Sequence, residues 1–194
     1  MSKLILIFFI FFTLSCSNND EVNINESENL YIDNTSDDRE LFVKSKEYIK
    51  KQQYELALIE LDKLEVLFPN SDFNKRGLLT SAYIYFLKED YEKSRAIAEN
   101  YKKYYPGSDD IAYANYLEAM TYFILIKKTN FSQQNAIIAL DKFNFILNAY
   151  PNSDYEIDIL TKVKLINNNL AAEKLDVAKF YLDKNNTNGA LVYL

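Results

Sequence analysis

The chain has 194 residues and a formal net charge of −6, and it contains three Gly, three Pro, one Cys and no His. So few Gly and Pro residues argue against an all-β protein with many tight turns and favour helices. Without His or a second Cys, the chain lacks the residues for a disulfide, for the usual zinc sites and for His-based catalysis. We therefore expect no catalytic residue, no metal and no cofactor.

Residues 1–15 predict an export signal. An apolar run from Leu4 to Phe12 follows a basic start, is too short to span a bilayer, and precedes Ser15-Cys16. This pair resembles the end of the lipobox of bacterial lipoproteins. The resemblance implies that Cys16 becomes the lipidated first residue of the mature chain and that Ser17 allows passage to the outer membrane. A buried helix or a short anchor is the alternative interpretation of the apolar run.

Residues 16–38 predict a disordered, acidic tether. They hold seven Asp and Glu residues, six Asn and no Lys or Arg, with only scattered apolar side chains. Such a composition buries too little apolar surface to offset the entropy lost on ordering. Residues 39–194 contain 21 Lys and Arg against 21 Asp and Glu, so this part is neutral. No basic surface stands out, and we expect no nucleic-acid partner.

One five-residue motif occurs three times in the neutral part, at intervals of 37 and 45 residues. An aromatic residue, Pro, and then a Ser-Asp pair that can cap the next helix are typical of a corner between two helices. Corners at such intervals indicate stacked helical repeats. The three copies are Phe68-Pro69-Asn70-Ser71-Asp72, Tyr105-Pro106-Gly107-Ser108-Asp109 and Tyr150-Pro151-Asn152-Ser153-Asp154.

Small residues keep a fixed distance from these corners. Ala57, Ser94 and Ala139 each precede a corner Pro by twelve positions. Tyr48 and Tyr85 precede the first two of these small residues by nine positions, and a further small residue lies three positions earlier. The spacing resembles that of the tetratricopeptide repeat, in which small residues let the two helices of a repeat approach closely.

The third and fourth repeats depart from this spacing. In the third, Ala139 follows Tyr122 by 17 positions instead of nine, which predicts a longer loop at about 127–134. The fourth begins at Ala178 and Tyr181, and its corner Pro would fall beyond Leu194. We therefore suspect a C-terminally truncated sequence with an incomplete last repeat.

The predicted fold is all-α, a tetratricopeptide-repeat helical solenoid of about three and a half to four repeats over residues 39–194. The segment before the fourth repeat has no Pro or Gly, which indicates one long helix, or two with a kink near 167–169. The predicted helices are 38–51, 54–67, 73–88, 91–104, 110–127, 133–149, 154–184 and 187–194.

The resemblance to tetratricopeptide solenoids also implies a binding groove lined by the first helix of each repeat. Tyr and Phe flanked by a few cations suit an extended peptide with aromatic side chains. For any single aromatic, the alternative is that it only packs neighbouring helices. The predicted groove residues are Arg39, Phe42, Lys46, Arg76, Tyr83, Phe86, Tyr113, Tyr116, Met120 and Phe123.

A lipobox, an acidic tether and repeats with these corners together resemble the BamD (ComL) family of outer-membrane assembly lipoproteins. The stretches that carry the resemblance are 67–71, 105–122 and 150–155, followed by the long helix that ends in Ala178-Lys179-Phe180-Tyr181. It implies a non-enzymatic scaffold, anchored by lipid on the periplasmic face of the outer membrane of a Gram-negative bacterium.

The same resemblance implies the partners. In this family the first repeats receive the C-terminal signal of unfolded outer-membrane β-barrel proteins, and the last repeats hold the periplasmic domains of BamA beside other assembly-machine lipoproteins. An alternative is a tetratricopeptide lipoprotein that coordinates cell-wall synthesis or envelope constriction with the Tol-Pal system. A lipid-anchored enzyme would need catalytic residues that the sequence does not show.

Overall fold

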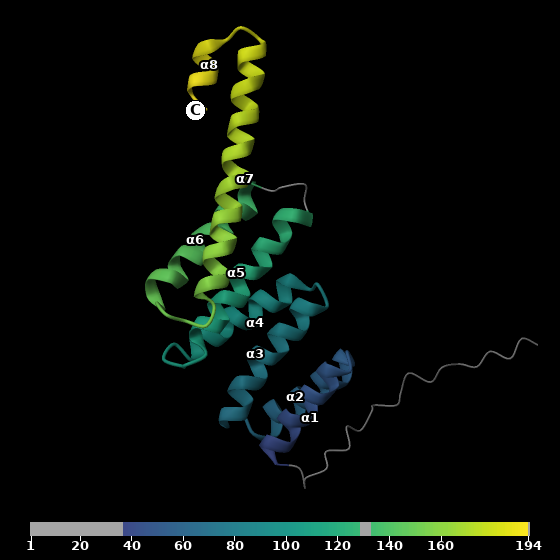
Figure 1. Ribbon diagram of the computed structural model, residues 1–194. Coiled ribbons are helices and arrows are strands. Elements are labelled where there is room, and N and C mark those ends of the chain that lie inside the picture. The colour runs from purple at the N-terminus through teal and green to yellow at the C-terminus, as the bar shows by residue number, and fades with distance from the viewer. Residues whose placement is uncertain (1–36, 129–132, 194) are drawn as a thin grey trace, which may run out of the picture. The chain divides into compact units, whose positions relative to one another are not determined.

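A computed structural model of the chain describes residues 37–128 and 133–193. The predicted export signal, Cys16 and nearly all of the predicted tether lie outside these residues. The described part contains eight helices in tandem, and each packs against the next (Figure 1). They are α1 (Asp38–Lys50), α2 (Tyr54–Leu67), α3 (Asp72–Leu87), α4 (Tyr91–Tyr104), α5 (Ile111–Lys128), α6 (Gln133–Ala149), α7 (Glu156–Asp183) and α8 (Thr187–Leu191).

These helices confirm the predicted all-α tetratricopeptide-type architecture. Eight small residues that occupy equivalent positions in the repeats, the predicted ones among them, are all buried, with exposed fractions of 0 or 1%. Because a small side chain leaves room for a second backbone, the two helices of a repeat pack closely at these points. The eight are Ser45, Ala57, Ala82, Ser94, Ala119, Ala139, Ala178 and Ala190.

The first and third corners start the next helix in different ways. At the first corner Ser71 is the N-cap of α3, as predicted, and its side chain accepts a 2.9 Å hydrogen bond from the Asn74 N–H. At the third corner the prediction is wrong, because α7 begins after Tyr155 and no side chain caps it. There Glu156 accepts a hydrogen bond from the Asn152 N–H instead and stabilises the turn.

The loop predicted at about 127–134 is corrected at both ends, because α5 extends to Lys128 and α6 begins at Gln133; residues 129–132 lie outside the described residues. α5 continues six residues beyond Tyr122, whereas α3 continues two beyond Tyr85. α6 begins six residues before Ala139, whereas α4 begins three before Ser94. Ile126 in the added turn is buried in the core, so apolar packing extends the helix.

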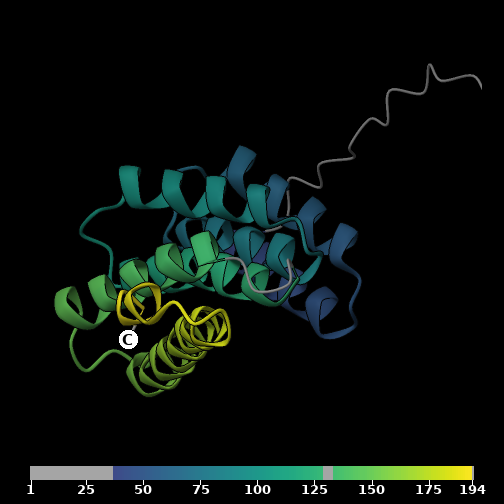
Figure 2. The ribbon, with the colours of Figure 1, turned by 90° about the horizontal axis from the view of Figure 1, so that it is seen from above.

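α7 is one continuous helix of 28 residues, which settles the choice between one helix and two. Asn167–Asn169 are exposed on its surface, while the flanking Ile166 is buried. α8 folds back beside the C-terminal half of α7 in both views (Figure 1, Figure 2). It ends at Leu191, earlier than predicted, and beyond its end the ring of Tyr193 stacks on Tyr181 at 5.7 Å.

Among the described residues, no helix is long and apolar enough to cross a membrane.

Candidate functional site: the first-helix face

The predicted groove residues lie on α1, α3 and α5, the first helices of three successive repeats. We call this set the first-helix face. α1 packs against α3 and α3 against α5, so the three helices form a continuous surface. Some of its side chains are already packed against neighbouring helices, and others are exposed. Only the exposed ones can contact another molecule.

The α1 part combines two cations with one packed aromatic. Arg39 and Lys46 are exposed. Phe42 is half-buried, because its ring packs against Phe73 with centroids 5.6 Å apart and against the core between α1 and α2. Of the three predicted groove residues on this helix, the two cations are therefore the accessible ones.

The α3 part contains the most accessible aromatic of the face. Tyr83 is 37% exposed, and Arg76 is exposed on the same helix. Phe86 is half-buried, with its ring edge-on to Tyr91 at 5.6 Å. Residues 76 and 83 are seven positions apart and thus lie on one side of the helix, so Arg76 and Tyr83 can contact one ligand.

The α5 part is engaged by α7. The Tyr116 ring stacks on Tyr155 at 4.6 Å, and the Tyr113 ring is tilted against the same Tyr155 at 5.7 Å. The Tyr116 hydroxyl donates a 2.7 Å hydrogen bond to Asp158. Burial raises the pKa of Tyr113 and of Tyr116 above the ordinary value, and Tyr83 adds to the effect at Tyr113. Tyr155 and Asp158 therefore already engage both α5 tyrosines.

The C-terminal end of α5 is covered in the same way. The ring of Phe123 contacts Phe143 of α6 edge-on at 6.1 Å, and Lys162 of α7 lies 5.4 Å from its centre. Lys162 also forms a 2.5 Å ion pair with Asp158. Met120 packs on the core shared by α5, α6 and α7. A peptide-binding role for these α5 residues remains a prediction.

Sequence reasoning missed Tyr155, the residue before α7, and the α7 residues Asp158 and Lys162. Asp158 and Lys162 are spaced i,i+4, as expected for an ion pair on one face of a helix, and this spacing was a usable signal. Burial alone would raise the pKa of Asp158, but the hydrogen bonds from Lys162 and Tyr116 outweigh it and lower that pKa. The charged form of Asp158 thus helps to hold α7 on the first-helix face.

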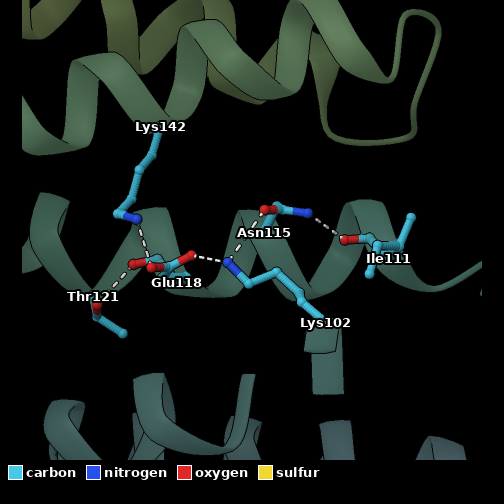
Figure 3. A network of polar contacts seen from close by, with 6 residues as sticks. All are labelled: Lys102, Ile111, Asn115, Glu118, Thr121 and Lys142. Carbon is cyan, nitrogen blue, oxygen red and sulfur yellow. Dashed lines mark hydrogen bonds and ion pairs between the residues drawn. The ribbon is translucent and has the colours of Figure 1, made fainter. Parts of the chain in front are cut away.

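A second missed residue, Glu118, lies inside the repeats next to the first-helix face. It is 3% exposed. Its carboxylate forms one ion pair with Lys102 of α4 and another, at 2.5 Å, with Lys142 of α6, so it connects α5 to both neighbouring helices (Figure 3). Lys102 also donates to Asn115, and Thr121 donates to the Glu118 carbonyl. Glu118 is the one Asp, Glu, Lys or Arg in residues 111–126, and this isolation in the sequence was the available signal.

The two lysines keep Glu118 ionised. Burial alone would raise the pKa of the carboxyl group, but the hydrogen bonds from Lys102 and Lys142 outweigh it and lower that pKa below its ordinary value. Buried charges are stable in proteins only when paired in this way. The network therefore fixes α5 between α4 and α6 and orients its first-helix face.

These features define a class of protein: a helical-repeat protein that presents surfaces for contact with other molecules. In the described residues, no group of three or more Cys, Asp or Glu side chains could hold a metal ion. The accessible polar and aromatic groups of the first-helix face can donate hydrogen bonds, form ion pairs and stack on aromatic side chains.

Comparison with known proteins identifies the family. A family model named YfiO and described as an outer membrane lipoprotein matches residues 34–192. The protein named outer membrane protein assembly factor BamD is 32% identical in Rickettsia prowazekii over 143 residues, or 74% of this chain. The proteins of the same name in Caulobacter vibrioides and Pasteurella multocida are 28% and 25% identical over 63% and 74% of the chain. The chain belongs to the BamD family.

The matched segments make up 57%, 40% and 59% of those three relatives. The chain thus spans about half the length of the curated relatives it matches.

Proposed function

We propose that this chain is the repeat region of a lipid-anchored periplasmic scaffold of the β-barrel assembly machinery. The observation that carries the proposal is the family match, which spans every described helix of the chain. Its relatives are named for assembly and for no chemical reaction, and we propose no catalytic role.

Unfolded outer-membrane β-barrel proteins are the proposed ligands of the first-helix face. Arg39, Lys46, Arg76 and Tyr83 are its exposed members and suit a peptide that carries aromatic side chains and a terminal carboxylate. The periplasmic domains of BamA and the other assembly-machine lipoproteins are the proposed partners of the last helices. Several apolar side chains of α7 are exposed, among them Ile157 and Phe180 at 82% and 58%, which supports an interaction there.

Recovery of partners from membranes tests this function. The full chain with an affinity tag, produced in its own cells and purified after mild solubilisation, should recover BamA. Recovery of Tol proteins or cell-wall synthases without BamA would favour the alternative of an envelope-constriction coordinator and contradict the proposal.

Replacing Tyr83 by Ala should weaken crosslinking of the chain to a peptide with the C-terminal sequence of a β-barrel protein by about fivefold, the effect of removing an aromatic anchor of about 1 kcal/mol. Phe145→Ala is the matched control, because Phe145 is 52% exposed but lies on α6, outside the first-helix face. Circular dichroism should show both variants folded. Equal crosslinking of Tyr83→Ala and the wild type would count against the first-helix face as the site.

We propose that Cys16 carries the lipid anchor. Cys16→Ala should abolish labelling with a radioactive fatty acid and release the chain from the membrane fraction, because Cys16 is the one thiol in the sequence. Ser17→Ala should retain both properties. Labelling that persists in Cys16→Ala would show that the lipobox interpretation is wrong.

A further inference from the structure

A cleft of about 560 Å³ lies between α2 and α4, with α3 as its floor. The two outer helices each pack on α3 but not on each other, which leaves the space between them open. α3 contributes Leu78, Ser81 and Tyr85 to the lining. We call this site the α2–α4 cleft.

The α2–α4 cleft lies on the other side of α3 from the first-helix face. Successive helical residues are rotated by about 100°, so Ser81 and Tyr83 point about 200° apart. None of the ten predicted groove residues lines the cleft. A molecule bound there would therefore leave Arg76 and Tyr83 free, and the inference goes beyond the proposed function.

Part of the lining of the cleft is apolar. Leu58 of α2, Leu78 of α3 and Ile97 of α4 are all half-buried and line it. Tyr104 also lines the cleft, and 68% of its surface is exposed, which is high for an aromatic residue in a helix. These side chains would lose further contact with water if apolar groups of another molecule entered.

The α2 wall carries two carboxylates, those of Asp62 and Glu65. Neither belongs to an ion pair among the described residues. Lys93 of the opposite wall lies with its ammonium group 4.2 Å from the centre of the Tyr85 ring. Burial raises the pKa of Asp62, and the nearby charge of Lys93 only partly opposes this rise. An additional cation would stabilise the ionised carboxylates.

We propose that the α2–α4 cleft docks a segment of a partner protein in which Lys or Arg residues stand beside apolar residues. The cations pair with Asp62 and Glu65, and the apolar side chains pack on Leu58, Leu78 and Ile97. An anionic lipid surface or a nucleic acid would instead face two carboxylates, and charge repulsion opposes both. The partner is therefore a basic, amphipathic protein segment.

The test is photo-crosslinking in the cells that produce the full chain. Asn100 lines the cleft and is exposed, so Asn100→p-benzoylphenylalanine places a photoreactive group there without disturbing the core. The crosslinked peptide is then sequenced by mass spectrometry. The same experiment is repeated with a double variant that combines Asp62→Lys and Glu65→Lys. The matched control is the double variant Glu92→Lys and Glu99→Lys, because both of these residues are exposed on α4 and lie outside the cleft lining.

We expect a crosslink to a segment of another protein with Lys or Arg between apolar residues. Its yield should fall about tenfold in the Asp62/Glu65 variant and stay unchanged in the control, since only the former places cations against cations. A crosslink only to a second copy of this chain, a crosslink to an acidic segment, equal yields in both variants, or no crosslink would overturn the proposal. Tyr83→Ala should not affect this yield, so failure of the first-helix face as a peptide site would be seen separately.

Discussion

Phe143→Ala is expected to lower the free energy of unfolding by about 3–5 kcal/mol, as is usual for removing a fully buried aromatic side chain. Phe143 is 0% exposed in the core that α5, α6 and α7 share, together with Ala119, Ile146 and Ile159. Truncation to Ala would leave a cavity there and remove the edge-on contact with Phe123. Urea unfolding followed by circular dichroism at 222 nm measures the effect.

Phe145→Ala provides the control on the same helix. Phe145 is 52% exposed and contacts Tyr150 edge-on at 6.1 Å, so its truncation should cost about 1 kcal/mol or less. Equal unfolding midpoints for the two variants would show that α6 does not pack as described. A loss in Phe143→Ala alone would confirm that this side chain packs the two helices of the third repeat, α5 and α6, against α7.

Glu118→Ala is expected to lower the free energy of unfolding by about 3 kcal/mol, because it removes the shared partner of two lysines. Lys102 and Lys142 are 24% and 31% exposed in their side chains, so both can regain part of their hydration. Asp141→Ala is the control, since Asp141 is exposed beside Lys142 and should change stability by about 0.5 kcal/mol or less. A Glu118→Ala variant as stable as this control would contradict a structural role for the network.

The lowered pKa of Glu118 also predicts how stability depends on pH. A group whose pKa is lower in the folded than in the unfolded chain stabilises the fold above its unfolded pKa, here near the ordinary 4.5. This stabilisation is lost as the pH falls through the lower folded value. The wild type should therefore lose stability below about pH 4.5 more steeply than Glu118→Gln, which has no carboxyl group to titrate there. Parallel curves for the two proteins would show that Lys102 and Lys142 do not favour the ionised form.

The helices and the phase of the repeats could be predicted from the sequence because they depend on residues close together in the chain. Pro69, Pro106 and Pro151 end helices through their own backbone geometry, and the small residues twelve positions earlier fix where two consecutive helices cross. The predicted helix bounds consequently agree with the structure to within about two residues everywhere except at the end of α8.

The bounds of the two helices of the third repeat were predicted correctly, but the loop assigned to about 127–134 was too long at both ends. Its eight residues contain no Gly or Pro, so local signals did not distinguish a loop from extended helices. Burial of Ile126 in a core made with α6 and α7 favours the helical form. That burial depends on residues up to 40 positions away, which the local pattern does not contain.

The sequence by itself determined an all-α repeat protein of the BamD family and the helices that carry its first-helix face. Only the tertiary structure decided which residues of that face stay accessible. Tyr155 and Asp158, at the start of α7, lie about 40 residues after Tyr116 in the chain. They nevertheless contact Tyr113 and Tyr116, while Tyr83 remains partly exposed. The physical reason is that an aromatic side chain at helical spacing can pack equally well against a neighbouring helix or against a ligand. Which of the two it contacts depends on the residues that the fold places beside it.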